Sequence, residues 1–147
     1  MNNKPTSISE VNPDDIHLEL MSYGLRDLVR VVGVTSFLTL VKHWPGQRIN
    51  IPQSRLTHLS KLRHVLTTDV LNALAKAYGG TTIDLPTEDK VLLMARDSII
   101  VRTINEQSLT NNDAAKLFGV SRRHIIRIRQ KMSTVQRPAT DLFLSRG

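Results

Sequence analysis

A 25-residue segment occurs twice in this chain, at a constant spacing of 34 residues. Aligned without gaps, residues 28–52 and 62–86 are identical at seven of 25 positions. The identical pairs are Leu28/Leu62, Val31/Val65, Leu40/Leu74, Lys42/Lys76, Gly46/Gly80, Ile49/Ile83 and Pro52/Pro86. Two unrelated amphipathic helices can share apolar spacing by chance, but chance does not easily explain the matching glycine, isoleucine and proline that follow. We therefore predict an internal duplication, in which both copies fold alike.

Each copy is predicted to contain a helix, a turn, a second helix, a glycine turn and a short strand. The first part has helical apolar spacing, whereas residues 48–51 and 82–85 alternate between polar and apolar and then meet a proline. Strands this short need a partner for their backbone groups. They could pair with each other within the chain, or each could pair with a second subunit. In both arrangements residues 14–86 form an assembly and dimerisation region rather than a catalytic domain.

The residues on either side of the duplication have simpler patterns. Residues 1–13 are polar and are predicted to form a disordered arm. Helical spacing begins at Asp14 and continues past Gly24, where we expect a break or a bend. After the second copy, Thr87 is a predicted N-cap of a helix that ends near residues 105–108.

Residues 109–131 have the spacing of a helix-turn-helix. Thr110 is the predicted N-cap of the first helix, with Asp113 in the usual Glu or Gln position of a capping box. Gly119 lies where the turn needs a residue that tolerates positive φ, and Ser121 caps the second helix. The side chains expected to pack the two helices together are Ala115, Val120, Ile125 and Ile128. The predicted fold is therefore mainly α: a duplicated helical module with a two-stranded ribbon, and a three-helix DNA-binding domain at residues 87–132.

The outer face of the second helix is basic. Between residues 116 and 131 there are six basic side chains and no acidic one, whereas an ordinary helical hairpin would mix both signs. A recognition helix inserts its first turns into the major groove, where Arg can bond guanine with two hydrogen bonds. We predict DNA contacts from Ser121, Arg122, Arg123, His124, Ile126, Arg127, Gln130, Lys131 and Lys116. Among these, Ile126 would meet a thymine methyl group, and His124 would touch a phosphate or solvent at the edge of the face.

The positive charge is concentrated at one end of the chain. The net charge is +7, and residues 108–147 carry eight basic and two acidic side chains, against twelve and eleven in residues 1–107. This asymmetry favours a polyanionic partner, with nucleic acid ahead of an anionic membrane surface. The chain has no cysteine and no apolar stretch long enough to span a membrane, so we expect a cytoplasmic protein with no membrane association.

Catalytic motifs are not evident in the sequence. The five histidines lack the spacing of a metal-binding helix, and Gly79-Gly80 precedes a predicted strand rather than a helix, unlike a phosphate-binding loop. We predict no metal site, no cofactor and no enzymatic activity. A recombinase-type DNA enzyme is the nearest alternative of another class, but it needs a nucleophilic Ser or Tyr in an Arg-rich catalytic domain. A repressor or another helix-turn-helix protein shares every feature above and stays open.

Residues 74–131 resemble the Mor transcription activators of Mu-like phages and prophages. The likeness lies in Ala-Tyr-Gly-Gly-Thr-Thr-Ile-Asp-Leu-Pro at 77–86, in Arg-Asp-Ser-Ile-Ile at 96–100, and in the helix-turn-helix through Lys131. The resemblance implies a homodimer that activates phage-type promoters by binding double-stranded DNA beside RNA polymerase. It also implies that Gly79 and Gly80 are hinge positions.

This chain departs from the family pattern in three places. Pro45 stands where the family motif has the first of two glycines, so the turn of the first copy should be stiffer. Asp84 replaces a common aromatic residue, and an acid there weakens the expectation that the strand approaches DNA. The recognition residues differ as well, so no operator sequence can be transferred. The role of the tail, residues 133–147, stays open.

Overall fold

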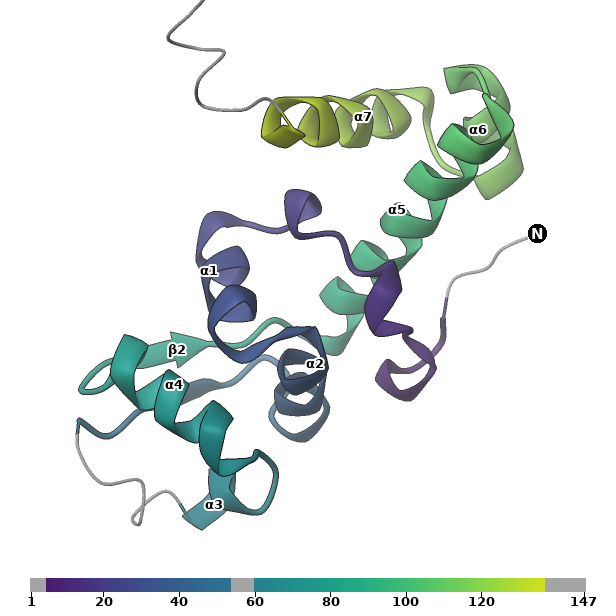
Figure 1. Ribbon diagram of the computed structural model, residues 1–147. Coiled ribbons are helices and arrows are strands. Elements are labelled where there is room, and N and C mark those ends of the chain that lie inside the picture. Colours follow the sequence, from purple (N-terminus) through teal and green to yellow (C-terminus); the bar gives the residue numbers. More distant parts are fainter. Residues whose placement is uncertain (1–4, 54–59, 137–147) are drawn as a thin grey trace, which may run out of the picture.

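The computed structural model describes residues 5–53 and 60–136, and it is mainly helical with a small two-stranded antiparallel sheet (Figure 1). This coarse architecture confirms the predicted fold class. The described chain begins with short 3-10 turns at Ile8–Glu10 (η1), Pro13–Asp15 (η2) and Leu18–Leu20 (η3). The α-helices are Tyr23–Val32 (α1), Val34–His43 (α2), Ser60–Arg63 (α3), Thr68–Tyr78 (α4), Glu88–Gln107 (α5), Asn111–Phe118 (α6) and Arg122–Gln136 (α7). The strands are Arg48–Asn50 (β1) and Thr82–Asp84 (β2).

The two strands pair with each other within the chain. The antiparallel register places Arg48 opposite Asp84, Ile49 opposite Ile83, and Asn50 opposite Thr82. Two further backbone bonds extend the ribbon: the Ile51 N–H donates to the Thr81 carbonyl at 2.8 Å, and the Leu85 N–H donates to the Gln47 carbonyl at 2.9 Å. Of the two pairings that the sequence left open, the structure has the one within the chain.

The larger of the two apolar cores lies among α1, α2, α4, the ribbon and the start of α5. The residues at its centre have no exposed surface: Phe37, Leu40, Val41, Leu74 and Val91. The ribbon contributes one face to this core through Ile51, Ile83 and Leu85. A ribbon of two short strands is marginal in water by itself, so burial of this face is what holds it.

A side-chain hydrogen bond connects α1 to α4. The Tyr78 hydroxyl donates to the carboxylate of Asp27, whose side chain is exposed. Partial burial and the bond to Asp27 together raise the pKa of Tyr78 to about 12. The neutral phenol is therefore the form that stabilises the fold.

Replacing Tyr78 with Phe is expected to lower the free energy of unfolding by about 1 kcal/mol at pH 7, because one hydrogen bond is lost while Asp27 stays solvated. The pKa of Tyr78 in the folded protein lies above the ordinary tyrosine value of 10, so the wild-type protein should lose this contribution as the pH rises from 10 to about 12. The variant should lack that part of the decline. Denaturant unfolding of both proteins at pH 7, 10 and 12 measures the difference, and parallel curves would contradict it.

The N-terminal residues differ from the prediction of a disordered arm. Ile8 and Val11 are buried, and the Ile8 N–H donates to the Glu88 carboxylate at 3.2 Å, so the described part of this segment packs against α5. Two apolar side chains in a polar segment are enough to fix it when a core offers room for them.

The prediction that a helix begins at Asp14 is also wrong. In the structure α1 begins at Tyr23, and Gly24 lies in its first turn rather than at a break. The preceding residues form η2 and η3 because Ile16, Leu18 and Leu20 recur at every second position, which does not give a helix one apolar face.

Helix α5 spans both cores of the protein. As predicted, Thr87 caps its start, with a hydroxyl that accepts from the Lys90 N–H at 3.3 Å, and the helix ends at Gln107, within the predicted range. Ser108, the C-cap, has the left-handed conformation. Val91, Leu92 and Ala95 belong to the larger core, whereas the second half of the helix faces a smaller core with α6 and α7. Among the described residues, no helix is both long enough and apolar enough to cross a membrane.

Candidate nucleic-acid interface

Helices α5, α6 and α7 pack around the smaller core. Its buried side chains are Leu20, Ile99, Ile100, Val101, Ile104, Ala114, Phe118, Ile125, Ile128 and Met132. The predicted burial of Ile125 and Ile128 is confirmed, at 0% and 2% exposure. The predicted packing of Ala115 and Val120 is confirmed, since both are partly buried against this core, while Ala114 and Phe118, one turn apart, are the buried side chains of α6.

The turn between α6 and α7 has the predicted local chemistry. The Thr110 hydroxyl accepts from the Asp113 N–H at 3.1 Å and caps α6. Gly119 ends that helix with φ of +66°, a conformation that side chains with a Cβ rarely adopt. The Ser121 hydroxyl then accepts from the His124 N–H at 3.0 Å at the start of α7. These caps fix where α7 begins and therefore which side chains its first turns present.

Exposed cations cover the outer side of α7 and its two flanks. We call this surface the basic face; it comprises Arg122, Arg123, Arg127, Arg129 and Lys131 of α7 with Lys116 of α6, all of them exposed. At about 100° per residue, Arg123, Arg127 and Gln130 lie opposite the buried row of α7. Ser121 and Gln130, the predicted polar contacts, are exposed as well.

The charge of the basic face is not neutralised by the rest of the described protein. The described arginines that do form ion pairs with carboxylates all lie outside the basic face: Arg48 with Asp84, Arg96 with Asp97, and Arg102 with Asp15. No carboxylate in residues 5–53 or 60–136 pairs with a cation of the basic face. Such a surface attracts polyanions over several ångströms, an effect that salt weakens.

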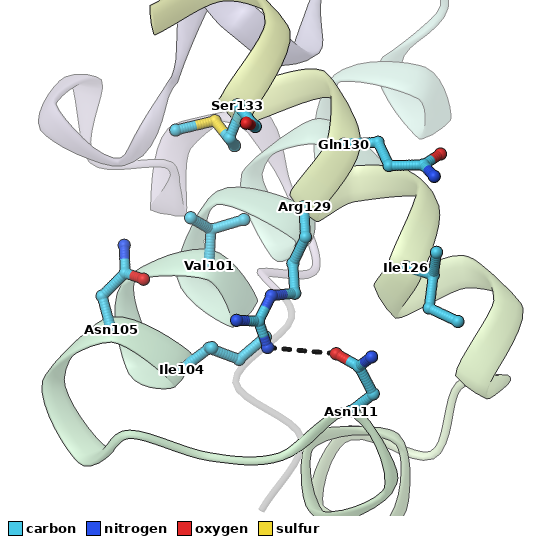
Figure 2. Close-up of a pocket in the computed structure, with 9 residues that line it drawn as sticks. Val101, Ile104, Asn105, Asn111, Ile126, Arg129, Gln130 and Ser133 are labelled. Carbon is cyan, nitrogen blue, oxygen red and sulfur yellow. Dashed lines mark hydrogen bonds between the residues drawn. The ribbon is translucent and has the colours of Figure 1, made fainter.

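A cavity of about 440 Å³ lies beside the basic face, between the end of α5, the start of α6 and α7. Figure 2 shows its lining, in which the Arg129 guanidinium donates to the Asn111 side-chain oxygen at 3.0 Å. Ile126 lies at this cavity and is only partly exposed. The prediction that Ile126 stands free on the outer face therefore needs correction, since part of the side chain is covered by its neighbours.

His124 is connected to α5 rather than standing at the edge of the outer face. Its Nε2 lies 2.8 Å from an Asp97 carboxylate oxygen and 3.3 Å from the Arg96 guanidinium. Asp97 is well covered, with 15% of its side chain exposed. Neither of the two predicted roles, phosphate contact or a solvated ring, describes this arrangement. The sequence had no local signal for it, because the partners lie 27 and 28 residues earlier.

Replacing His124 with Ala is expected to lower the free energy of unfolding by about 1 kcal/mol, since one hydrogen bond between α5 and α7 is lost. The salt dependence of the predicted DNA binding should not change, because the ring faces α5 instead of the outer surface. Thermal unfolding and a salt titration of DNA affinity measure the two effects. A slope of log affinity against log salt reduced by about one would show a phosphate contact and contradict this placement.

The two glycines implied as hinges lie in a tightly packed turn. The Gly79 N–H donates to the Ala75 carbonyl and the Gly80 N–H to the Ile51 carbonyl, each at 2.8 Å. A Cβ on Gly79 would lie 2.4 Å from the Ala75 carbonyl oxygen and 3.2 Å from that of Gln53. Close backbone packing is thus a sufficient reason for glycine at position 79, and the hinge role stays a prediction.

The exposed ribbon carries a neutral pair of charges rather than a cationic surface. Arg48 and Asp84, opposite each other in the register, form an ion pair at 2.7 Å with 70% of each side chain exposed. The acid that the sequence showed at position 84 thus balances the only nearby strand cation in the described ribbon. This geometry gives no support to a DNA contact from β2.

No protein-family model, curated protein or solved structure matches this chain. The case for a function therefore depends on the interface itself and on the residues that hold it.

Proposed function

We propose that this protein is a sequence-specific DNA-binding regulator of transcription, with α7 as the recognition helix of a helix-turn-helix. The observation that carries the proposal is the basic face: Arg123 and Arg127 are exposed opposite the buried row of α7, and neither has a carboxylate partner among the described residues. Arginine can both neutralise phosphates and read guanine, and a single helix fits the major groove.

The packing of α5, α6 and α7 supports the helix-turn-helix reading. An eight-residue helix, a turn through Gly119 and a second helix capped by Ser121 follow one another without a long loop. The outer side of the first turns of α7, which carries Arg123 and Arg127, is exposed, as it must be to enter a groove. No acidic side chain lies between Lys116 and Lys131 to repel the DNA backbone.

The sheet register supports an origin of the assembly module by duplication. Ile49 and Ile83, which the 34-residue shift equates, lie opposite each other. The same shift equates Ile51 with Leu85 and Gln47 with Thr81. It therefore converts the hydrogen bond from the Ile51 N–H to the Thr81 carbonyl into the one from the Leu85 N–H to the Gln47 carbonyl. Gly46 and Gly80, also equivalent, both have positive φ, at 67° and 82°. We propose that an approximate two-fold axis through the isoleucine pair relates the two copies.

We propose that the protein acts as a homodimer and as an activator. One recognition helix reads only a few base pairs, and a two-fold dimer doubles the site. The resemblance of residues 74–131 to Mor activators supports activation at phage-type promoters and a contact with RNA polymerase. The module of α1 to α4 with the ribbon is the proposed dimerisation region.

Selection of binding sites from a random duplex library tests the proposal with the full-length protein. We expect enrichment of a two-fold symmetric sequence, and an affinity that falls steeply with salt, by about 0.9 in log–log slope for each phosphate neutralised. Failure to enrich any sequence at low salt would overturn it. A monomeric mass at micromolar concentration, with and without the selected DNA, would overturn the dimer.

Footprinting on a promoter that contains the selected site separates activation from repression. An activator is expected to protect DNA beside the polymerase site and to strengthen the polymerase footprint. Occupation of the core promoter with loss of the polymerase footprint would contradict activation and leave the DNA-binding proposal intact.

A further inference from the structure

The segment of residues 13–21, which we call the N-terminal strap, lies against the recognition helix. It contains η2 and η3, and η3 contacts α7 (Figure 1). Leu20 is 8% exposed and belongs to the smaller core with Ile125, Ile128 and Met132. A side chain 105 to 112 positions earlier in the chain thus packs with the buried row of α7.

The strap is fixed along α5 by polar contacts. The Asp15 carboxylate pairs with Arg102, and the His17 N–H donates to the Ser98 hydroxyl at 3.2 Å. Ser98 is 1% exposed and its hydroxyl donates in turn to the Met94 carbonyl at 3.0 Å. The Ser98 hydroxyl thus donates within α5 and accepts from the strap backbone, which connects the strap to the middle of that helix.

The other end of the strap is held by α1. The Arg26 guanidinium donates to the carbonyls of Leu18 and Met21, at 3.1 Å each. Met21 is buried in the larger core, whereas its neighbour Leu20 is buried in the smaller one. Consecutive residues therefore connect the assembly module to the DNA-binding helices, and Arg26 fixes the backbone on both sides of them.

We propose that the N-terminal strap positions the recognition helix, with Leu20 as the contact to α7 and Arg26 as its anchor in the assembly module. The inference rests on the proposed function, since it assigns the strap to DNA binding. Helix α7 packs against the rest of the protein through one row of apolar side chains, Ile125, Ile128 and Met132. Truncation of Leu20 to alanine would leave a cavity beside that row. A helix seated loosely presents Arg123 and Arg127 at variable positions, and base contacts tolerate little displacement. Residues 87–132 alone are then an incomplete DNA-binding unit.

The test compares full-length Leu20→Ala with Leu28→Ala, which removes the same atoms from the larger core at 3% exposure. Hydrogen exchange of α7 amides and the dissociation constant for the selected DNA are measured below the melting temperature of both variants. Leu20→Ala is expected to speed exchange of residues 125–132 at least tenfold and to weaken specific binding at least fivefold. Leu28→Ala should leave both within about twofold of the wild type.

A second pair of variants serves if Leu20→Ala does not fold. Arg26→Gln removes the charge of the anchor, and Arg30→Gln makes the same change at an exposed position of the same helix. Arg26→Gln is expected to speed exchange in α7 and to weaken specific binding at least threefold, whereas Arg30→Gln should do neither.

Equal effects within either pair would overturn the positioning role. The two proposals fail separately, because hydrogen exchange needs no DNA. If the wild-type protein enriches no DNA sequence, the proposed function fails while exchange in α7 still tests the packing of the strap. If the wild type binds a selected site and Leu20→Ala binds it as tightly, the strap proposal fails alone.

Discussion

Replacing Gly79 with Ala is expected to lower the free energy of unfolding by roughly 2–3 kcal/mol. The added Cβ would lie 2.4 Å from the Ala75 carbonyl oxygen, a separation that real Cβ atoms essentially never show. That oxygen also accepts the Gly79 N–H at 2.8 Å, so it cannot retreat without loss of the bond that ends α4. The backbone angles of Gly79, φ −54° and ψ 131°, suit any residue, so the cost comes from the contact alone.

Gly24→Ala is the matched control for this change. Gly24 lies in α1 with nothing within 4 Å of its Cβ position, so alanine there should raise the free energy of unfolding by about 0.5–1 kcal/mol through helix propensity. Urea unfolding of both variants measures the effects. Unchanged stability of Gly79→Ala together with altered DNA affinity would instead favour the hinge role.

Local signals in the sequence predicted much of this fold. Thr87, Thr110 and Ser121 each cap the helix they were expected to cap, because a hydroxyl at an N-terminus acts within three residues. Gly119 ends α6 for a reason confined to its own backbone. The alternation at residues 48–51 and 82–85 predicted the strands, while the choice of partner depended on the core that the ribbon covers.

Contacts between distant segments were beyond the reach of the sequence pattern. Leu20 and Met21 were predicted to lie on one helix, and nothing in their spacing indicates that they belong to different cores. His124 stands on the predicted recognition helix, but its ring faces Asp97 on α5. Ile126 is only partly exposed and lines a cavity together with residues of α5 and α6. In each case the deciding partner comes from another element, and only the packed structure brings the two together.

The arginines at the centre of the basic face should dominate specific DNA binding. Arg123→Ala and Arg127→Ala are each expected to weaken binding to the selected site by about 5- to 150-fold, the value of a good bidentate base contact. Neither residue has a carboxylate partner in the described chain, and both are exposed, so stability should change by less than about 0.5 kcal/mol. Binding to an unrelated duplex should weaken far less, so that the ratio of specific to non-specific affinity falls.

Lys131→Ala is the control that separates base contacts from phosphate contacts. Lys131 is exposed on the same helix but lies toward the flank of the basic face. Its loss is expected to weaken all duplexes alike and to reduce the slope of log affinity against log salt by about one. The physical distinction is that a phosphate contact carries no sequence information, whereas a contact to a base edge is lost only on the right sequence. If all three variants weakened specific and unrelated duplexes by the same factor, α7 would not read bases in the proposed orientation.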